Sequence, residues 1–236
     1  MNELSVVVEN APSPPVTLGR EALRAGAEGY LRRHPEPVLE IQGDVPVDFR
    51  EALFDALADE GVPIVQPLAN RVSSDVWRAH CGARPGRCDA TDMIFRQSLA
   101  AALLGAVHDL AVYRPDPVKG YTDFVSRVGE TLRPRRKTGR SEITGQMRGA
   151  GDCEDLTILY IAMARALGFR ANALWIQQDG AFQNHVAAAV YVPTQFSPSG
   201  APLWAETTIP GARVGEHPYI VVERLGHQPR LFGGSE

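Results

Sequence analysis

The chain contains few cysteines and no long apolar run. Its 236 residues include only three cysteines, Cys81, Cys88 and Cys153. A small and odd number of cysteines is typical of reduced thiols rather than of a disulfide framework. No run of about 18 apolar residues occurs, and the first residues lack the basic segment followed by an apolar segment that marks a secretion signal. We therefore expect a protein made in the cytoplasm, without a transmembrane helix.

Neither sign of charge dominates the sequence. There are 24 Lys and Arg against 28 Asp and Glu, which gives a formal net charge of −4. This balance provides no reason to expect specific nucleic-acid or membrane partners. Hydrophobic residues make up 44% of the chain and charged residues 22%, which is ordinary for a globular protein. The length is sufficient for one large domain or two small ones.

The first third of the sequence alternates between two kinds of hydrophobic pattern. Strands are predicted over residues 4–10, 37–43 and 62–68, and helices over 19–34 and 47–61. Alternation of this kind indicates a small α/β unit with a parallel or mixed sheet. We assign this unit to residues 1–72.

The remaining residues, 73–236, have helical patterns first and strand patterns later. Helices are predicted over residues 75–80, 90–113 and 153–167, with a helix or turn over 121–132 and a loop over 133–151. Strands are predicted over residues 171–178, 183–192 and 202–208. A turn at Asp179-Gly180 would join the first two of these strands as a hairpin. The predicted fold class is therefore α+β, with a helical layer followed by an antiparallel sheet.

The segment GAGDCEDL places a cysteine at a predicted helix start. Asp152 is a suitable N-cap, and Gly168 is suited to close the same helix. Cys153 then lies in the first turn, where free backbone N–H groups and the helix dipole favour a thiolate. The acids Asp152, Glu154 and Asp155 oppose this, because nearby negative charge raises a thiol pKa. The helix end alone is therefore insufficient, and a cationic partner is needed.

Two strand residues further along the chain complete a catalytic pattern. His185 shares a strand face with Ala187, Ala189 and Tyr191, and the small alanines beside it leave room for a helix end. Glu206 lies on a strand that can be adjacent and can orient the imidazole, so the set has the nucleophile–base–orienter order of acyl-transfer enzymes. The Cys153 backbone N–H and the Gln146 side chain are candidates for an oxyanion hole. Taken singly, a buried cysteine is usually a packing residue and a histidine on a strand is usually structural.

The segments GAGDCEDLTILYIAMARALGF, NHVAAAVYV and LWAETT resemble the transglutaminase-like superfamily of papain-like cysteine enzymes, in particular its bacterial and phage-borne members. The resemblance covers roughly residues 92–210 and is most specific around the cysteine. It implies a papain-like helix packed on an antiparallel sheet, with Cys153, His185 and Glu206 as the catalytic triad. Glu206 stands where the family more commonly has Asp. The resemblance does not account for residues 1–72.

These observations predict a cysteine-dependent acyl-transfer enzyme that hydrolyses a peptide or amide bond, with a peptide or protein as substrate and no cofactor. The alternative is a non-catalytic phage virion or assembly protein that keeps the fold and associates with other virion proteins. A third reading is a metal-binding protein built on His80, Cys81 and Cys88, but no CxxC pair is present and a zinc site needs four ligands. The basic run at residues 133–140 is either a solvated loop or a rim that attracts an anionic substrate.

Overall fold

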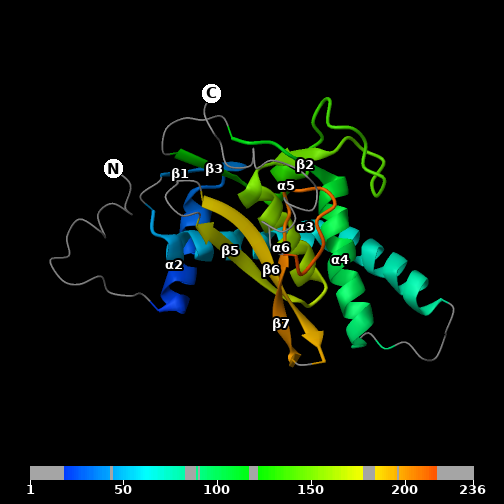
Figure 1. The fold of residues 1–236 in the computed structure, drawn as a ribbon. Coiled ribbons are helices and arrows are strands. Elements are labelled where there is room, and N and C mark those ends of the chain that lie inside the picture. The colour runs from blue at the N-terminus through cyan, green and yellow to red at the C-terminus, as the bar shows by residue number, and fades with distance from the viewer. Residues whose placement is uncertain are drawn as a thin grey trace.

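The chain folds as a mixture of helices and small sheets, which agrees with the predicted α+β class (Figure 1). The computed structural model describes residues 19–42, 45–82, 89, 91–116, 122–177, 184–195 and 197–216. The predicted strand at residues 4–10 and the predicted turn at Asp179-Gly180 lie outside these residues. Among the described residues, no helix is both long enough and apolar enough to cross a bilayer.

Helix α6 (Cys153–Ala166) lies at the centre of the molecule. Helices α3 (Val47–Cys81) and α4 (Met93–Leu110) and strand β6 (Asn184–Thr194) pack around it (Figure 1). Every side chain from Glu154 to Ala164 is buried as a result. A helix that is covered on all sides must be apolar around most of its circumference, as this one is.

Both ends of α6 are capped as the sequence predicts. The Asp152 side chain accepts a hydrogen bond from the Asp155 backbone N–H at 3.2 Å. At the other end Gly168 has a φ of 73°, a conformation that glycine adopts without strain. The N–H of Phe169 donates to the Ala164 carbonyl, and that of Gly168 donates to the Arg165 carbonyl. This pair of hydrogen bonds is a Schellman motif, which ends the helix and turns the chain into the sheet.

The predicted strand at residues 62–68 is wrong, because these residues continue α3 as one helix up to Cys81. Pro63 and Pro67 both lie on its exposed side, where water can satisfy the carbonyl groups that proline leaves unpaired. Val65 and Ala69 are fully buried on the opposite side. Burial of this face against the core therefore outweighs the local preference of the two prolines for ending a helix.

The three predicted C-terminal strands form one antiparallel sheet, as predicted. The order is β5 (Arg170–Gln177), β6 and β7 (Ser197–Ala205). In the register of the sheet, Ile176 is opposite His185, and Ala188 is opposite Ala205. This places the residue after β7 beside the beginning of β6.

Two smaller sheets and two further helices complete the described fold. The first sheet pairs β1 (Val38–Gln42) antiparallel with β3 (Thr122–Ser126), and the second pairs β2 (Ala111–Tyr113) parallel with β4 (Gly149–Gly151). The helices are α2 (Arg20–Arg33) and the short α5 (Val128–Thr131). The predicted division after residue 72 falls inside α3, and buried residues from both sides of it share one core cluster.

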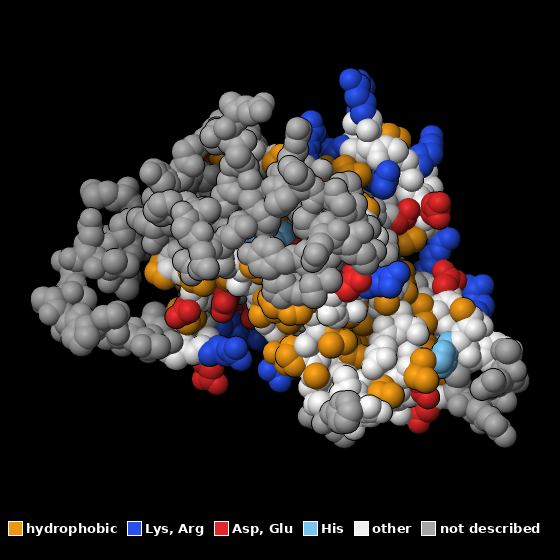
Figure 2. Space-filling model, in the orientation of Figure 1, with side chains coloured by type: hydrophobic (Ala, Val, Ile, Leu, Met, Phe, Trp, Pro, Cys, Tyr) orange, Lys and Arg blue, Asp and Glu red, His pale blue; other side chains and the backbone are white. Residues whose placement is uncertain are grey.

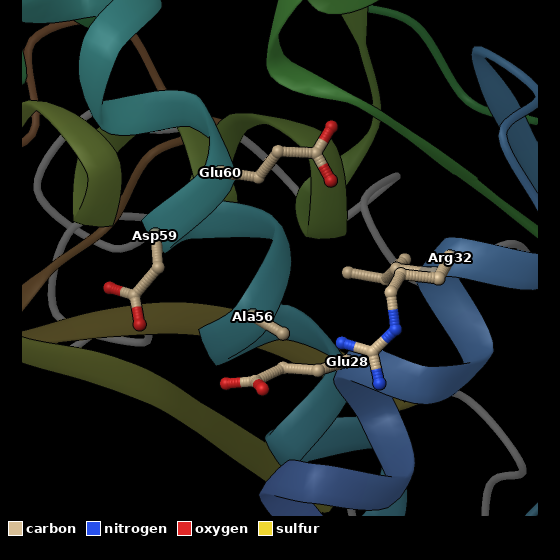
Figure 3. Close-up of a pocket in the computed structure, with 6 residues that line it drawn as sticks. Glu28, Arg32, Ala56, Asp59 and Glu60 are labelled. Carbon is tan, nitrogen blue, oxygen red and sulfur yellow. The ribbon is translucent and has the colours of Figure 1, made fainter.

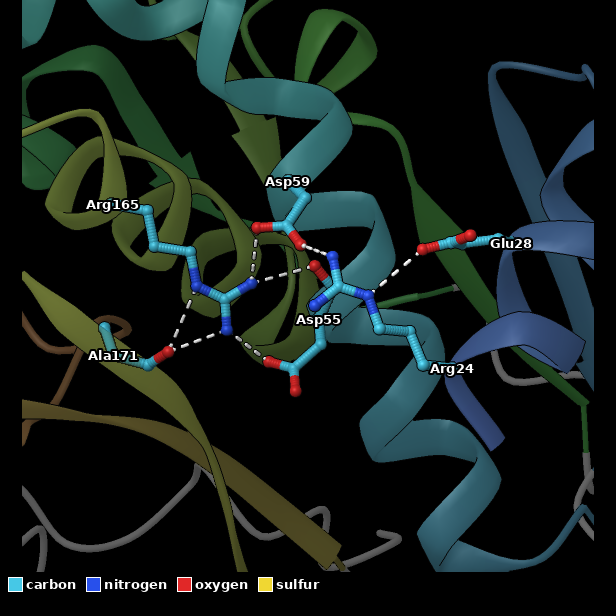
Figure 4. Close-up of polar contacts among 6 residues, drawn as sticks. All are labelled: Arg24, Glu28, Asp55, Asp59, Arg165 and Ala171. Carbon is cyan, nitrogen blue, oxygen red and sulfur yellow. Dashed lines mark hydrogen bonds and ion pairs between the residues drawn. The ribbon is translucent and has the colours of Figure 1, made fainter. Parts of the chain in front are cut away.

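Arg165, near the end of α6, connects four elements of the fold (Figure 4). Its guanidinium donates to the Asp59 carboxylate at 2.9 Å, to the Asp55 carboxylate at 2.5 Å and to the Ala171 carbonyl at 2.7 Å. Asp59 also accepts a hydrogen bond from Arg24 of α2 at 2.9 Å. The planar guanidinium suits several acceptors at once. This cluster therefore joins α6 to α2, α3 and β5.

Candidate functional site

His185 and Glu206 meet at one end of the sheet formed by β5, β6 and β7. The Nε2 atom of His185 lies 2.6 Å from the Oε2 atom of Glu206. His185 is on β6 and is 5% exposed, and Glu206 follows β7 directly and is fully buried. The structure therefore brings these two predicted residues together in the way that the adjacent strands suggested. Since Nε2 faces the carboxylate, Nδ1 is the ring nitrogen on the other side of the imidazole.

Thr208 holds the second oxygen of the Glu206 carboxylate. The backbone N–H and the hydroxyl of Thr208 donate to Oε1 at 2.9 and 2.6 Å. Burial would raise the pKa of Glu206, but the hydrogen bonds and charge of His185 and the hydrogen bonds of Thr208 lower it below its ordinary value. The carboxylate is thus ionised and oriented. Sequence reasoning missed this role of Thr208, because a threonine after a strand has no signal that separates it from an ordinary turn residue.

Cys153 lies in the first turn of α6, and α6 packs against β6. Thr157, one turn further along α6, donates from its hydroxyl to the Val186 carbonyl at 3.2 Å. The Val186 backbone also hydrogen-bonds the thiol, an interaction that acts to lower the Cys153 pKa. The thiol therefore lies next to the residue that follows His185 in β6. The helix end and the small side chains of this strand make this approach possible.

The hydrogen-bond acceptor of the thiol is Glu154. The Sγ atom of Cys153 donates to Oε2 of Glu154 at 2.9 Å. Burial raises the pKa of Cys153 well above its ordinary value, and the charges of Glu154 and Asp152 raise it further. These effects outweigh the hydrogen bond from Val186. The sulfur is therefore protonated in this arrangement, so the partial positive charge of the helix end does not by itself produce a thiolate.

Asp155 connects the same helix turn to β3 and has a structural role. Its Oδ1 atom accepts from the Ser126 backbone N–H at 2.6 Å. Burial raises the pKa of Asp155 to about 7 despite this hydrogen bond. A Cβ atom added at Gly151 would lie 2.4 Å from the Asp155 Cβ, so only glycine fits there. The Gly-rich segment before Cys153 thus permits a close approach to the first turn of α6.

Gln146, the predicted second donor of the oxyanion hole, lies on an exposed loop. Its backbone carbonyl accepts from the Ser141 N–H at 2.8 Å, and its N–H donates to the Thr144 hydroxyl at 3.3 Å. These hydrogen bonds stay within the loop, and among the described residues no hydrogen bond joins the Gln146 side chain to Cys153. The role assigned to Gln146 stays a prediction. Arg136 and Lys137 of the nearby basic run are also exposed, and Figure 2 shows several basic side chains at the upper right of this face.

His108 of α4 contacts the backbone of Glu206 and Thr207 and was not predicted as part of the site. Burial lowers its pKa, while hydrogen bonds with the backbone of Glu206 and Thr207 act in the opposite direction. Its Nε2 atom is buried and has no hydrogen-bond partner among the described residues. A neutral imidazole therefore supports the backbone that carries Glu206. A single histidine within a long helical pattern gave no sequence signal for this position.

The expectation of three reduced thiols is wrong for Cys81, which is disulfide-bonded, whereas Cys153 is free. The number of cysteines indicates a redox class, but only the tertiary fold brings two sulfur atoms together. No group of three or more His, Cys, Asp or Glu residues suited to a metal ion occurs in the described part of the chain. Cys88, which belongs to the metal site considered from the sequence, lies outside the described residues.

A surface pocket lies between α2 and α3 (Figure 3). Its lining residues are Glu28, Leu31, Arg32, Ala56, Asp59 and Glu60. The carboxylates of Glu28 and Asp59 pair with Arg24, and that of Glu60 pairs with Arg127. These acids are therefore engaged in holding α2 and the β3–α5 segment against α3. None of the residues predicted for catalysis lines this pocket.

Comparison of the chain with protein-family models, with curated proteins and with solved structures gives no match. The functional argument therefore depends on the geometry around Cys153, His185 and Glu206.

Proposed function

We propose that this protein is a cysteine-dependent acyl-transfer enzyme that hydrolyses a peptide or amide bond. The single observation that carries the proposal is the 2.6 Å contact between His185 Nε2 and the buried carboxylate of Glu206, beside a helix that begins at Cys153. A buried carboxylate that orients an imidazole next to a helix-terminal thiol is the arrangement expected of a nucleophile, a base and an orienting group. The resemblance of the surrounding sequence to transglutaminase-like enzymes supports the same reaction and a papain-like fold.

In the proposed mechanism, the thiol S–H bond breaks and the proton moves to Nδ1 of His185. The sulfur attacks the carbonyl carbon of the substrate, and the backbone N–H of Cys153 stabilises the oxyanion that forms. The C–N bond then breaks, and the leaving amine takes the proton from His185. Water adds to the thioester with His185 as the base, which releases the acid and restores the thiol. Glu206 keeps the imidazole oriented and stabilises its positive charge throughout.

The test is turnover of a peptide library by the full chain and by three variants. Wild-type protein should cleave some members and form a thioester at Cys153, detectable by mass spectrometry as an acyl adduct. Cys153→Ala and His185→Ala should each lose about 10³-fold or more of the activity. His80→Ala is a matched control, because His80 lies near Asp92 at the far end of α3. Equal turnover by wild type and Cys153→Ala would exclude the mechanism.

The second candidate is a non-catalytic phage virion or assembly protein that retains the fold. The observation that favours it is the hydrogen bond from the Cys153 thiol to Glu154, which opposes formation of a nucleophilic thiolate. This candidate predicts no turnover of any library member and no adduct at Cys153. It also predicts that Cys153→Ala preserves a stable assembly of defined size, which analytical ultracentrifugation would detect. An adduct at Cys153 with turnover would exclude it.

A further inference from the structure

The carboxylate of Glu154 occupies a position that the proposed mechanism does not use. It is adjacent to the nucleophile in the chain and is only 4% exposed. Its Oε2 atom accepts a hydrogen bond from the Cys153 thiol at 2.9 Å. A distance of this length is within the range expected for a group that acts directly on a nucleophile. The thiol therefore has an acid–base group within hydrogen-bond distance on its own helix, in addition to His185, which precedes the Val186 that the thiol contacts on β6.

The charged and titratable groups around this pair are mostly acidic. Asp152 caps α6 and Asp155 lies on it, while Tyr113, Asp116 and Asp123 come from the segments packed against it. On β6, His185 precedes Val186, whose backbone contacts the thiol. The cation Arg50 of α3 donates to the Asp123 carboxylate at 2.7 Å. Because neighbouring acids oppose further negative charge, a thiolate beside an ionised Glu154 is strongly disfavoured.

We propose that Glu154 holds Cys153 in its protonated form, so that the nucleophile becomes available only when the Glu154 carboxylate is neutralised. When the S–H bond breaks, its proton passes to His185 and negative charge develops on a sulfur 2.9 Å from this carboxylate. An ionised Glu154 opposes that step, and a protonated or cation-paired Glu154 does not. The inference deepens the proposed function by adding a control of the same nucleophile. It concerns thiol reactivity, so it can be tested without any substrate.

The test is the rate at which iodoacetamide alkylates Cys153 in the full chain, followed by mass spectrometry of the peptide that contains it. In Glu154→Gln the repulsion between the carboxylate and a thiolate at Cys153 is lost, and the new amide can donate a hydrogen bond to that thiolate. A lower thiol pKa raises the thiolate fraction at about pH 7 more than it reduces the nucleophilicity of the thiolate. We therefore expect Glu154→Gln to react about tenfold faster at about pH 7. Glu142→Gln removes an equal charge from the exposed loop and should react at the wild-type rate.

The thermal midpoint of Glu154→Gln is measured in parallel, because an unfolded chain would also alkylate quickly. If that variant does not fold, Glu154→Ala takes its place, because it also removes the carboxylate. Faster alkylation of either folded variant than of wild type supports the proposal. A folded variant that reacts no faster than wild type, or a wild-type alkylation rate whose midpoint against pH lies below the ordinary cysteine pKa of about 8.5, would overturn it. Absence of turnover on peptides would remove the proposed enzyme function but would leave this result unaffected.

Discussion

The imidazole of His185 and the carboxylate of Glu206 form a hydrogen-bonded pair that is closed to solvent on nearly all sides. The two residues are 21 positions apart in the chain, and their facing atoms are 2.6 Å apart. The register of β6 against β7 produces the contact, since Ala188 is opposite Ala205 and the next residue along faces the His185 side of the sheet. The pair is thus a consequence of strand pairing, and several expectations follow from its burial.

Replacing Glu206 by Gln should reduce activity and alter the dependence of stability on pH. The pKa of Glu206 is lowered in the folded protein. A lowered pKa stabilises the fold above the ordinary carboxyl pKa, and this contribution is lost as pH falls through the folded value. We expect Glu206→Gln to be about 1–3 kcal/mol less stable near neutral pH, with the difference shrinking in acid. Urea unfolding of both proteins at several pH values measures this.

In the enzyme assay, Glu206→Gln should lose at least about 10²-fold in kcat with a small change in KM, because the imidazole loses its orienting charge. Thr208→Val, which removes one of the two hydrogen bonds to Oε1, should have a weaker effect in the same direction. A Glu206→Gln protein that retains full kcat would show that Glu206 contributes only to stability.

Asp155→Asn should change the dependence of stability on pH in the direction opposite to that of Glu206→Gln. Burial raises the pKa of Asp155 to about 7 in the folded protein. The folded state therefore binds this proton more tightly than the unfolded chain, and stability falls as pH rises between the unfolded and the folded value. As pH falls from about 8 to about 5, the free energy of unfolding of wild type should rise relative to Asp155→Asn by about 1–3 kcal/mol. Parallel curves for the two proteins would contradict this assignment.

Gly61→Ala should destabilise the packing of α3 on α5 and α6. An added Cβ would lie 2.4 Å from Val128 Cγ2 and 3.3 Å from the Ala162 Cβ. Overpacking of this kind costs about 1–3 kcal/mol. Gly105→Ala is the matched control, because it is an exposed helical glycine of α4 with nothing within 4 Å of the added atom. The control should gain about 0.5–1 kcal/mol, and thermal unfolding of the two variants should therefore shift in opposite directions.

Arg165→Lys should show how much the cluster at the end of α6 depends on guanidinium geometry. Lysine keeps the charge but cannot contact Asp55, Asp59 and the Ala171 carbonyl together. We expect a loss of about 2–3 kcal/mol in the free energy of unfolding. Arg133→Lys is the control, since Arg133 is 67% exposed on its side chain and makes one 3.4 Å contact with Glu130. A loss for Arg165→Lys no larger than for this control would mean that the charge alone is sufficient.

Some elements were readable from the sequence because their signals are local. The capping residues Asp152 and Gly168 and the apolar run between them predicted α6 within one residue of its observed end. Alternating residues predicted the three strands of the antiparallel sheet. In contrast, the pattern over residues 62–68 predicted a strand, but these residues continue α3. The burial of one face of this helix segment was not visible in the sequence.

By itself, the sequence determined which residues could do chemistry and the kind of element that each occupies. Cys153 at a helix start and His185 within a strand follow from local patterns of capping and alternation, and Glu206, predicted within the next strand, directly follows its end. Only the tertiary structure decided which atoms meet. Strand register brought Glu206 onto His185, and the docking of α6 on β6 placed the thiol beside Val186. From the sequence, Glu154 is only a suitable residue for a helix start. In the folded protein it is buried and accepts a hydrogen bond from the thiol, and the strength of this interaction depends on the distance and the local dielectric that packing sets.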